Sequence, residues 1–340
     1  MRIHLGCTYE ELISLDNLLS AWQEFLPGKR YKKDVADFSR NLFDNLHDLH
    51  NDLKTRTYKH GGYYAFSISD PKPRNIHKAS VRDRILHHAI YRSLYPFFDR
   101  KFIYDSYSCR NEKGTHKAID RLNSFVHCVG KNNTQSCWVL KCDITKFFAS
   151  IDHQILLAIL RESISDQGIL WLLEQVIRSF DSGVPGKGLP LGNLTSQLLV
   201  NIYMNEFDQF VKHNLKMKYY IRYADDFVFL DNNRGKLMKL LAPIGDYLTG
   251  QLKLSLHPKK VIIAAISSGV DFLGWVHFPR HRILRTNTKR RMFNRIKESP
   301  TEPTLHSYEG LLSHGSTLGL KQTLHNYYGL FRNSVEKENN

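Results

Sequence analysis

The stretch that decides the fold joins two runs of aromatic and β-branched residues through a pair of adjacent carboxylates. It reads Tyr219-Tyr220-Ile221-Arg222-Tyr223-Ala224-Asp225-Asp226-Phe227-Val228-Phe229-Leu230. The flanking runs favour strands, and an Asp-rich corner is typical of a β-hairpin. Two neighbouring carboxylates repel each other unless a cation neutralises them, and hard divalent ions such as Mg²⁺ prefer oxygen ligands. The alternative is a solvated turn, because Asp is a favoured turn residue.

A second Asp ends another apolar run earlier in the chain. This run reads Trp138-Val139-Leu140-Lys141-Cys142-Asp143-Ile144, and a helix is predicted shortly after it, from Asp152 to Arg161. A two-metal phosphoryl-transfer site needs carboxylates from separate elements, which bridge two ions about 3.5–4 Å apart. One ion activates the attacking 3′-hydroxyl and the other stabilises the leaving pyrophosphate. Asp143 together with the Asp225-Asp226 pair would supply such a set.

The order of these motifs resembles that of reverse transcriptases. Tyr223-Ala224-Asp225-Asp226 resembles their Tyr-x-Asp-Asp box, and Asp143 has the place of their first catalytic Asp. Six further motifs follow the family order, and the resemblance covers about residues 60 to 335. They are Pro71-Lys72-Pro73-Arg74, Arg82-Asp83-Arg84, Ser106-Tyr107-Ser108-Cys109-Arg110, Leu189-Pro190-Leu191-Gly192, Leu256-His257-Pro258-Lys259-Lys260 and Phe272-Leu273-Gly274-Trp275.

The resemblance implies an α+β right-hand polymerase fold with fingers, a palm built on an antiparallel sheet, and a thumb. The expected segments are a helical N-terminal segment 1–57, fingers 58–138, a palm 139–278 that includes the loop 183–192, a thumb 279–335 and a frayed tail 336–340.

The resemblance also implies a set of site residues. Asp143, Asp225 and Asp226 would be catalytic and, together with Ile144, would hold two Mg²⁺ ions, with Mn²⁺ as a substitute. Lys260 would protonate the departing pyrophosphate. The incoming nucleotide would meet Lys72, Arg74, Arg110, Phe148, Leu191 and Gly192. Phe148 would exclude a ribose 2′-hydroxyl, and the alternative is that Phe147 and Phe148 are both core residues. Primer and template would contact Tyr223, Phe272, Leu273, Gly274, Trp275, Arg285, Lys289, Arg290 and Arg291.

The loop before the predicted helix at 193–212 indicates which group of reverse transcriptases the chain resembles. Most relatives have Gln where this chain has Leu191, and an aliphatic residue with Thr195-Ser196-Gln197 downstream resembles the reverse transcriptases of diversity-generating retroelements. Those enzymes misincorporate opposite template adenine. The implied partners are an RNA template, a DNA or RNA primer, dNTPs and a small basic accessory protein. A group II intron, retron or antiviral enzyme is one alternative, and an inactive RNA-binding scaffold is another.

Composition agrees with a nucleic-acid partner. The formal net charge is +15 over 340 residues, and the segment from Pro279 to Lys297 is rich in His, Arg and Lys, as expected of a phosphate-facing surface. Five cysteines without a CxxC pair indicate free thiols in a reducing cytosol. No apolar run approaches the length of a membrane span, so we expect a cytoplasmic protein without membrane contact.

Local patterns predict further elements. Residues 10–55 show the spacing of two helices separated at Pro27-Gly28-Lys29-Arg30, and 58–70 reads as a strand or hairpin with Gly61-Gly62 as a turn. A helix is predicted from Arg82 to Phe98, with His87 and His88 outside its apolar face. Adjacent side chains on a helix point in different directions, so we do not expect these two histidines to bind one metal ion. Residues 254–260 and 261–265 are predicted to form a short strand pair.

Overall fold

The computed structural model describes the backbone of residues 4–69 and 73–338, and side chains up to Arg332. Its contacts divide the chain into two compact units, and each unit is built from three separate segments. The first unit comprises 1–110, 143–218 and 242–259, and the second comprises 111–142, 219–241 and 260–340. The boundaries expected for fingers, palm and thumb stay a prediction.

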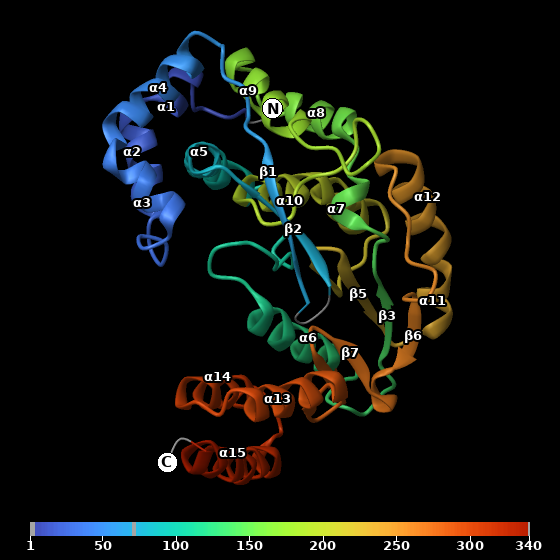
Figure 1. Cartoon of the computed structure of the whole chain (residues 1–340). Coiled ribbons are helices and arrows are strands. Elements are labelled where there is room, and N and C mark those ends of the chain that lie inside the picture. Colours follow the sequence, from blue (N-terminus) through green and yellow to red (C-terminus); the bar gives the residue numbers. More distant parts are fainter. Residues whose placement is uncertain (1–3, 70–72, 339–340) are drawn as a thin grey trace. The chain divides into compact units, whose positions relative to one another are not determined.

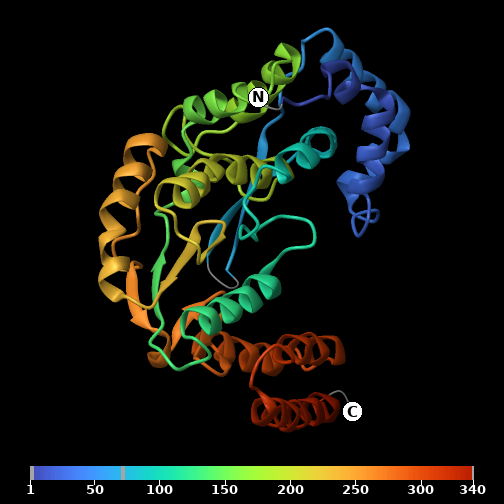
Figure 2. The same ribbon diagram turned by 180° about the vertical axis from the view of Figure 1, so that it is seen from behind.

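Four helices open the first unit, where the sequence pattern predicted two. They are α1 (Tyr9–Ile13), α2 (Leu15–Phe25), α3 (Lys33–Arg40) and α4 (Leu42–Lys54). The first extra break lies at Ser14, whose hydroxyl caps α2 by accepting a hydrogen bond from the Asn17 amide. The second lies at Asn41, whose φ of −119° and ψ of 44° are not helical. Figures 1 and 2 show these helices as one group beside α5.

The central helix of the first unit is α5 (Val81–Asp99), which confirms the helix predicted at 82–98. Its predicted apolar face is buried, and it packs against α2, α3, α4 and α10. His87 was expected outside that face, but it is only 1% exposed. The predicted helix at 193–212 is α10 (Leu194–Gln209), which continues as a π-helical turn, η1 (Phe210–Asn214).

The only two-stranded sheet among the described residues is the hairpin of β1 (Tyr63–Ile68) and β2 (Arg74–Ala79), in which Tyr63 pairs with Ala79. Gly61-Gly62 precedes β1, so the expectation of a turn there was wrong: both strands lie after the glycines. The first unit also contains α7 (Phe147–Ser150), α8 (His153–Arg161), α9 (Gln167–Arg178) and nearly all of α12 (Leu241–Leu252). Asp152 and Asp166 cap α8 and α9 by accepting backbone amide hydrogen bonds.

A four-stranded antiparallel sheet forms the centre of the second unit. Its order is β4 (Tyr220–Tyr223), β5 (Asp226–Asp231), β3 (Trp138–Cys142) and β6 (Ile262–Ala265). Phe227, Val228, Phe229 and Leu230 are each 0% exposed, and since successive side chains point to opposite faces, both faces of β5 are covered. The helices α6 (Thr115–Val129) and α11 (Arg234–Lys239) pack against this sheet.

The strand pair predicted between residues 254–260 and 261–265 does not form. Ile262–Ala265 is β6, and it pairs with β3. Leu256 makes an isolated bridge to Ile144 instead. Both segments were predicted to pair with each other, but their partners are Ile144 and β3, which lie more than a hundred residues earlier in the chain.

The rest of the second unit is a small sheet followed by three helices. The turn η2 (Ile266–Ser268) leads into β7 (Val270–Phe272), β8 (Trp275–His277) and β9 (Arg282–Leu284), and then into α13 (Thr286–Glu298), α14 (Glu302–Leu312) and α15 (Leu318–Glu338). A core cluster that includes Trp275, Met292, Ile296, Leu312 and Leu324 joins the sheet to the helices.

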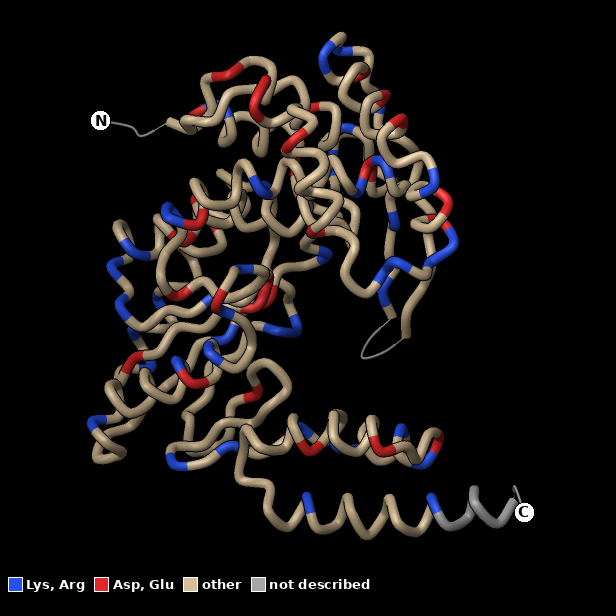
Figure 3. Tube along the Cα trace, turned by 90° about the vertical axis from the view of Figure 1, so that its left-hand side faces the viewer, with Lys and Arg blue, Asp and Glu red and all other residues tan. Residues whose placement is uncertain are grey.

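The last helix, α15, extends to Glu338, and the expected frayed tail at 336–340 stays a prediction. From Leu318 to Arg332 it contains Lys and Arg but no Asp or Glu, and Figure 3 shows blue without red on this helix before its grey end. None of the helices in the described ranges combines the length and the apolar character that crossing a membrane requires.

Candidate active site

The carboxylate pair lies at the tip of the β4–β5 hairpin, as the sequence predicted. Tyr223 pairs with Asp226, so Ala224 and Asp225 form a two-residue turn. Ala224 has a φ of +54°, a left-handed conformation that costs an Ala about 1–2 kcal/mol. The turn is held by its neighbours: the buried Arg222 donates to the Ala224 carbonyl at 3.3 Å, and Thr115 Oγ1 donates to the Tyr223 hydroxyl at 3.1 Å. Local strain of this kind is typical of functional turns.

The register of β3 shows where the strand that precedes Asp143 ends. Cys142, the last residue of β3, pairs with Phe227, which follows Asp226 directly. Asp143 is the next residue after Cys142, and consecutive Cα atoms are about 3.8 Å apart. Asp143 itself is 7% exposed, and its carbonyl accepts a hydrogen bond from the His257 amide at 2.8 Å.

Ile144 has no polar side chain, so it can offer a metal only its backbone carbonyl. Its bridge to Leu256 is made by the groups on either side of it. The Asp143 carbonyl accepts from His257, and the Thr145 amide donates to the Ser255 carbonyl at 2.9 Å. This arrangement is compatible with the expected role of Ile144, which stays a prediction.

Lys141 is a residue of the site that the sequence analysis missed. Its Nζ lies 3.7 Å from Asp226 Oδ1 and donates to the Asp271 carbonyl at 2.9 Å, and its side chain is 15% exposed. A cation at this distance reduces the repulsion between the paired carboxylates. The signal was a single Lys inside the otherwise apolar run of β3.

The chemistry of the carboxylate oxygens fits a hard divalent ion. Within the described residues, no group of three or more His, Cys, Asp and Glu side chains is assembled as a metal site. Asp225 and Asp226 nevertheless bring two carboxylates to one turn of the second unit, and Asp143 follows the strand that pairs beside them. Oxygen donors of this type suit Mg²⁺ or Mn²⁺.

Phe147 and Phe148 have different environments. Phe147 is 4% exposed, whereas Phe148 is half-buried, and their rings meet edge to face at 5.6 Å between centroids. The structure therefore places Phe147 in the core and leaves part of the Phe148 ring accessible. The role of Phe148 against a 2′-hydroxyl stays a prediction.

The loop that carries Leu191 and Gly192 is fixed to β2 of the first unit. The His77 amide donates to the Leu191 carbonyl, and Asn193 Nδ2 donates to the His77 carbonyl, each at 2.9 Å. Gly192 has a φ of +106°, and a Cβ there would lie 2.7 Å from Ile76 Cγ2. Only glycine fits this close approach, so the loop and the hairpin position each other.

The basic residues expected to bind the triphosphate differ in their exposure and in their contacts. Lys72 lies outside the described residues. Arg74 is exposed at the start of β2. Arg110 is 6% exposed and its guanidinium already donates to the Asp99 carboxylate and carbonyl and to the carbonyls of Ile103 and Ser106. A triphosphate contact by Arg110 stays a prediction, and it would have to replace some of these bonds.

The expected primer contact at residues 272–275 is a tight hairpin turn between β7 and β8. Leu273 and Gly274 both have positive φ, 51° and 88°, as a type I′ turn requires. Phe272 and Trp275 are 0% and 1% exposed, so their side chains belong to the core of the second unit. Leu273 and Gly274 are half-buried, and the primer contact of residues 272–275 stays a prediction.

The remaining predicted contacts are partly accessible. Lys289 and Arg290 are exposed on α13, while Arg291 and Lys260 are half-buried. Arg285 forms an ion pair with Asp271. Of this set, Lys289 and Arg290 are therefore best placed to meet phosphate groups from solvent.

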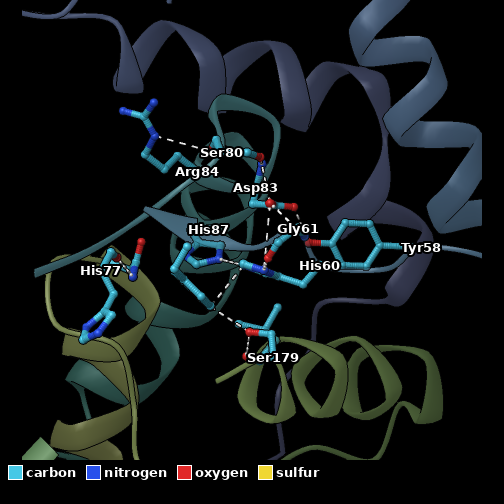
Figure 4. A network of polar contacts seen from close by, with 12 residues as sticks. Tyr58, His60, Gly61, His77, Ser80, Asp83, Arg84, His87 and Ser179 are labelled. Carbon is cyan, nitrogen blue, oxygen red and sulfur yellow. Dashed lines mark hydrogen bonds and ion pairs between the residues drawn. The ribbon is translucent and has the colours of Figure 1, made fainter. Parts of the chain in front are cut away.

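A buried polar network in the first unit was not foreseen from the sequence (Figure 4). Asp83 accepts hydrogen bonds from the Tyr58 hydroxyl at 2.8 Å, from Ser80 Oγ at 2.7 Å and from the Gly61 amide at 3.1 Å. His87 lies 3.0 Å from His60 and 3.1 Å from Thr195 Oγ1. The network thus joins the approach to β1, helix α5 and the start of α10. Burial lowers the pKa of His87 to about 3, with smaller effects from His60, His88 and Arg84.

Comparisons with known proteins identify the family of this chain. The family model described as "Reverse transcriptase (RNA-dependent DNA polymerase)" matches residues 59–277, more than half of the chain. The chain belongs to this family and has its right-hand polymerase fold, a mixture of helices and antiparallel sheet.

Curated relatives show the same family at low identity. The chain is similar to "Protein YkfC" of Escherichia coli (strain K12), with 28% identity over 258 residues, 65% of this chain and 66% of that protein. It is similar to the "Putative COX1/OXI3 intron 2 protein" of Saccharomyces cerevisiae, with 22% identity, 68% of this chain and 34% of that protein. It is also similar to the "Group II intron-encoded protein LtrA" of Lactococcus lactis subsp. cremoris, with 23% identity, 53% of this chain and 32% of that protein. The chain thus spans less than two thirds of the length of these relatives.

Proposed function

We propose that the chain is an RNA-directed DNA polymerase that extends a primer on an RNA template with dNTPs. The observation that carries this proposal is the register of the second unit's sheet. The Cys142–Phe227 pair and the Tyr223–Asp226 pair align the end of β3 with the carboxylate turn. In a family of RNA-dependent DNA polymerases, this alignment supports Asp143, Asp225 and Asp226 as the catalytic carboxylates.

These three carboxylates, with the Ile144 carbonyl, would hold two Mg²⁺ ions, and Mn²⁺ would serve as a substitute. When bound, such ions supply Lewis acidity toward the attacking 3′-hydroxyl and the pyrophosphate. The protein's own residues orient the reactants. Lys260 donates a proton to the departing pyrophosphate, and Lys72, Arg74 and Arg110 bind phosphate oxygens. Phe148 limits the space at the 2′ position of the incoming sugar.

The segments predicted to form the fingers, palm and thumb would hold the primer and the template. Support for the thumb comes from α13, where Lys289 and Arg290 are exposed beside the half-buried Arg291. Tyr223, at the base of the carboxylate turn, and the turn residues Leu273 and Gly274 would contact the primer. Cationic side chains on such a helix bind the nucleic-acid backbone without regard to sequence.

Within the family, we propose the error-prone enzyme of a diversity-generating retroelement. Support comes from Leu191, whose position is fixed by the His77 amide but whose side chain has no hydrogen-bonding group. A polar side chain there would add one hydrogen bond to the nucleotide, worth about 0.5–1.5 kcal/mol. Without it, selection of the incoming base is looser. A small basic accessory protein is part of this proposal.

An intron-encoded enzyme is the second candidate, because the names of two of the relatives described above refer to introns. Primer extension on one RNA template, followed by sequencing of the cDNA, separates the candidates. The retroelement proposal expects frequent errors opposite template adenine, reduced by up to about tenfold in Leu191→Gln. Accurate copying by the wild type would refute the retroelement proposal and leave the polymerase proposal intact. Absence of extension on any primed template would refute both.

A further inference from the structure

The second unit contains a polar pocket that none of the site residues described above lines. Its cavity volume is about 310 Å³, and it lies between the β8–β9 turn, the end of α6 and the connection from α14 to α15. Five of its lining residues are basic, and none is Asp or Glu. The basic residues are Arg280, Arg282, His127, His281 and His314.

Arg282 is held in place before any ligand arrives. Its Nη1 donates to Asp120 Oδ1 at 2.9 Å, its Nε donates to the His314 carbonyl, and its side chain is 14% exposed. Among the contacts of the described residues, its Nη2 donates no hydrogen bond. A fixed guanidinium loses little conformational entropy when it binds an anion, and its geometry matches phosphate oxygens.

Arg280 supplies charge that the pocket itself does not neutralise. It is exposed and forms no ion pair within the described part of the chain. The other Arg of the pocket, Arg282, is already paired with the Asp120 carboxylate. The pocket therefore keeps an excess of positive charge.

An aromatic surface borders the same cations. The rings of Phe278 and His281 stack with a centroid separation of 4.8 Å and an interplanar angle of 13°. The Phe278 amide donates to the His281 carbonyl at 2.9 Å, which closes the β8–β9 turn around Pro279 and Arg280. Nucleic-acid bases stack on such rings, whereas carboxylates of an acidic peptide gain nothing from them.

We propose that this pocket binds one nucleotide of a single-stranded nucleic acid outside the polymerase site, with its phosphate at Arg280 and Arg282 and its base on the Phe278–His281 stack. This proposal rests on one part of the proposed function, namely that the chain binds nucleic acid. It assigns to the β8–β9 turn a role in holding the strand, separate from nucleotide addition.

Binding of a fluorescently labelled single-stranded RNA to the full chain, measured by anisotropy over a range of salt without dNTPs or divalent ions, tests the proposal. Arg280→Ala should weaken binding and lower the slope of log affinity against log salt by about one phosphate contact. His281→Ala should weaken binding about fivefold with little change in slope. Arg161→Ala, which removes an exposed Arg of α8 in the other unit, is the matched control and should bind like the wild type.

Two outcomes would overturn the proposal. One is equal binding by Arg280→Ala and Arg161→Ala, with both variants shown to be folded by circular dichroism. The other is displacement of the RNA by polyglutamate as effectively as by unlabelled RNA, which would indicate an acidic protein partner. Repeating the titration in an Asp225→Asn background keeps this test independent of polymerase activity, since binding at the pocket should be unchanged there.

Discussion

The Nε2 atoms of His60 and His87 lie 3.0 Å apart, so only one of them carries a hydrogen. The Nδ1 of His60 lies 2.6 Å from the Gly61 carbonyl, a distance that requires an N–H on that nitrogen. In the neutral ring, His60 Nε2 is then the acceptor and His87 Nε2 the donor. His87 Nδ1 in turn accepts from the Thr195 hydroxyl at 3.1 Å. One backbone carbonyl thus sets the direction of a hydrogen-bond chain that reaches the start of α10.

The low pKa of His87 predicts a loss of stability in acid. Burial lowers this pKa to about 3, while the unfolded chain has an ordinary histidine value near 6.5. Between these two pH values the unfolded state binds a proton that the folded state does not, so the free energy of unfolding falls as the pH falls. His88 and His277, with pKa values lowered to about 4 chiefly by burial, act in the same direction.

Urea unfolding at several pH values between 7 and 4 measures this effect. His87→Gln should make the pH dependence shallower by up to about 1.4 kcal/mol per pH unit, at the cost of lower stability at neutral pH. His47→Gln, at an exposed histidine, is the control and should leave the slope unchanged. An equal slope in the wild type and His87→Gln would show that His87 is not the group that titrates.

Asp225→Asn or Asp226→Asn should reduce primer extension by at least about a hundredfold. The cause is loss of the charge that would hold the metal ions, while the hairpin pairing from Tyr220 to Asp231 does not depend on that charge. Anisotropy with a primer–template duplex should show nearly unchanged binding. Near-normal extension by either variant would mean that the catalytic carboxylates lie elsewhere.

Phe148→Ala should allow incorporation of ribonucleotides, because it removes the accessible ring next to the buried Phe147. Single-nucleotide extension with dNTPs and rNTPs measures the discrimination ratio, which should fall by about tenfold or more. The comparison with Phe147→Leu is the control, since a conservative change at the core residue should affect stability more than sugar selection. Unchanged discrimination in a folded Phe148→Ala protein would assign the gate to another residue.

Gly315→Ala should strongly destabilise the second unit. A Cβ at Gly315 would lie 2.1 Å from the Trp275 ring, and Trp275 belongs to the core that joins the small sheet to α13, α14 and α15. We expect a loss of about 1–3 kcal/mol or more. Gly310→Ala, on α14 where a Cβ meets open space, should instead stabilise by about 0.5–1 kcal/mol. Thermal unfolding of both variants checks the pair, and similar melting temperatures would contradict the packing argument.

The sequence by itself determined the elements whose pattern is local. The β4–β5 hairpin, α5 and the helix that begins after Asp152 were predicted, because strand alternation and helical spacing depend on neighbouring residues. The carboxylate pair and Asp143 could also be named as candidate catalytic residues, because the order of motifs along the chain can be read from the sequence. The two extra N-terminal breaks at Ser14 and Asn41 were missed, since polar residues in a helical pattern do not show which of them will interrupt it.

Only the tertiary structure decided which of those residues are accessible and what they contact. Phe272 and Trp275 belong to a motif expected at the primer, and the structure shows that both side chains are buried. Trp275 is buried because it packs against apolar side chains of α13, α14 and α15. His87 is buried because its two ring nitrogens find partners in His60 and Thr195, which come from segments 27 and 108 residues away. A sequence pattern records the polarity of each side chain, but burial of a polar side chain depends on partners that only the folded chain brings together.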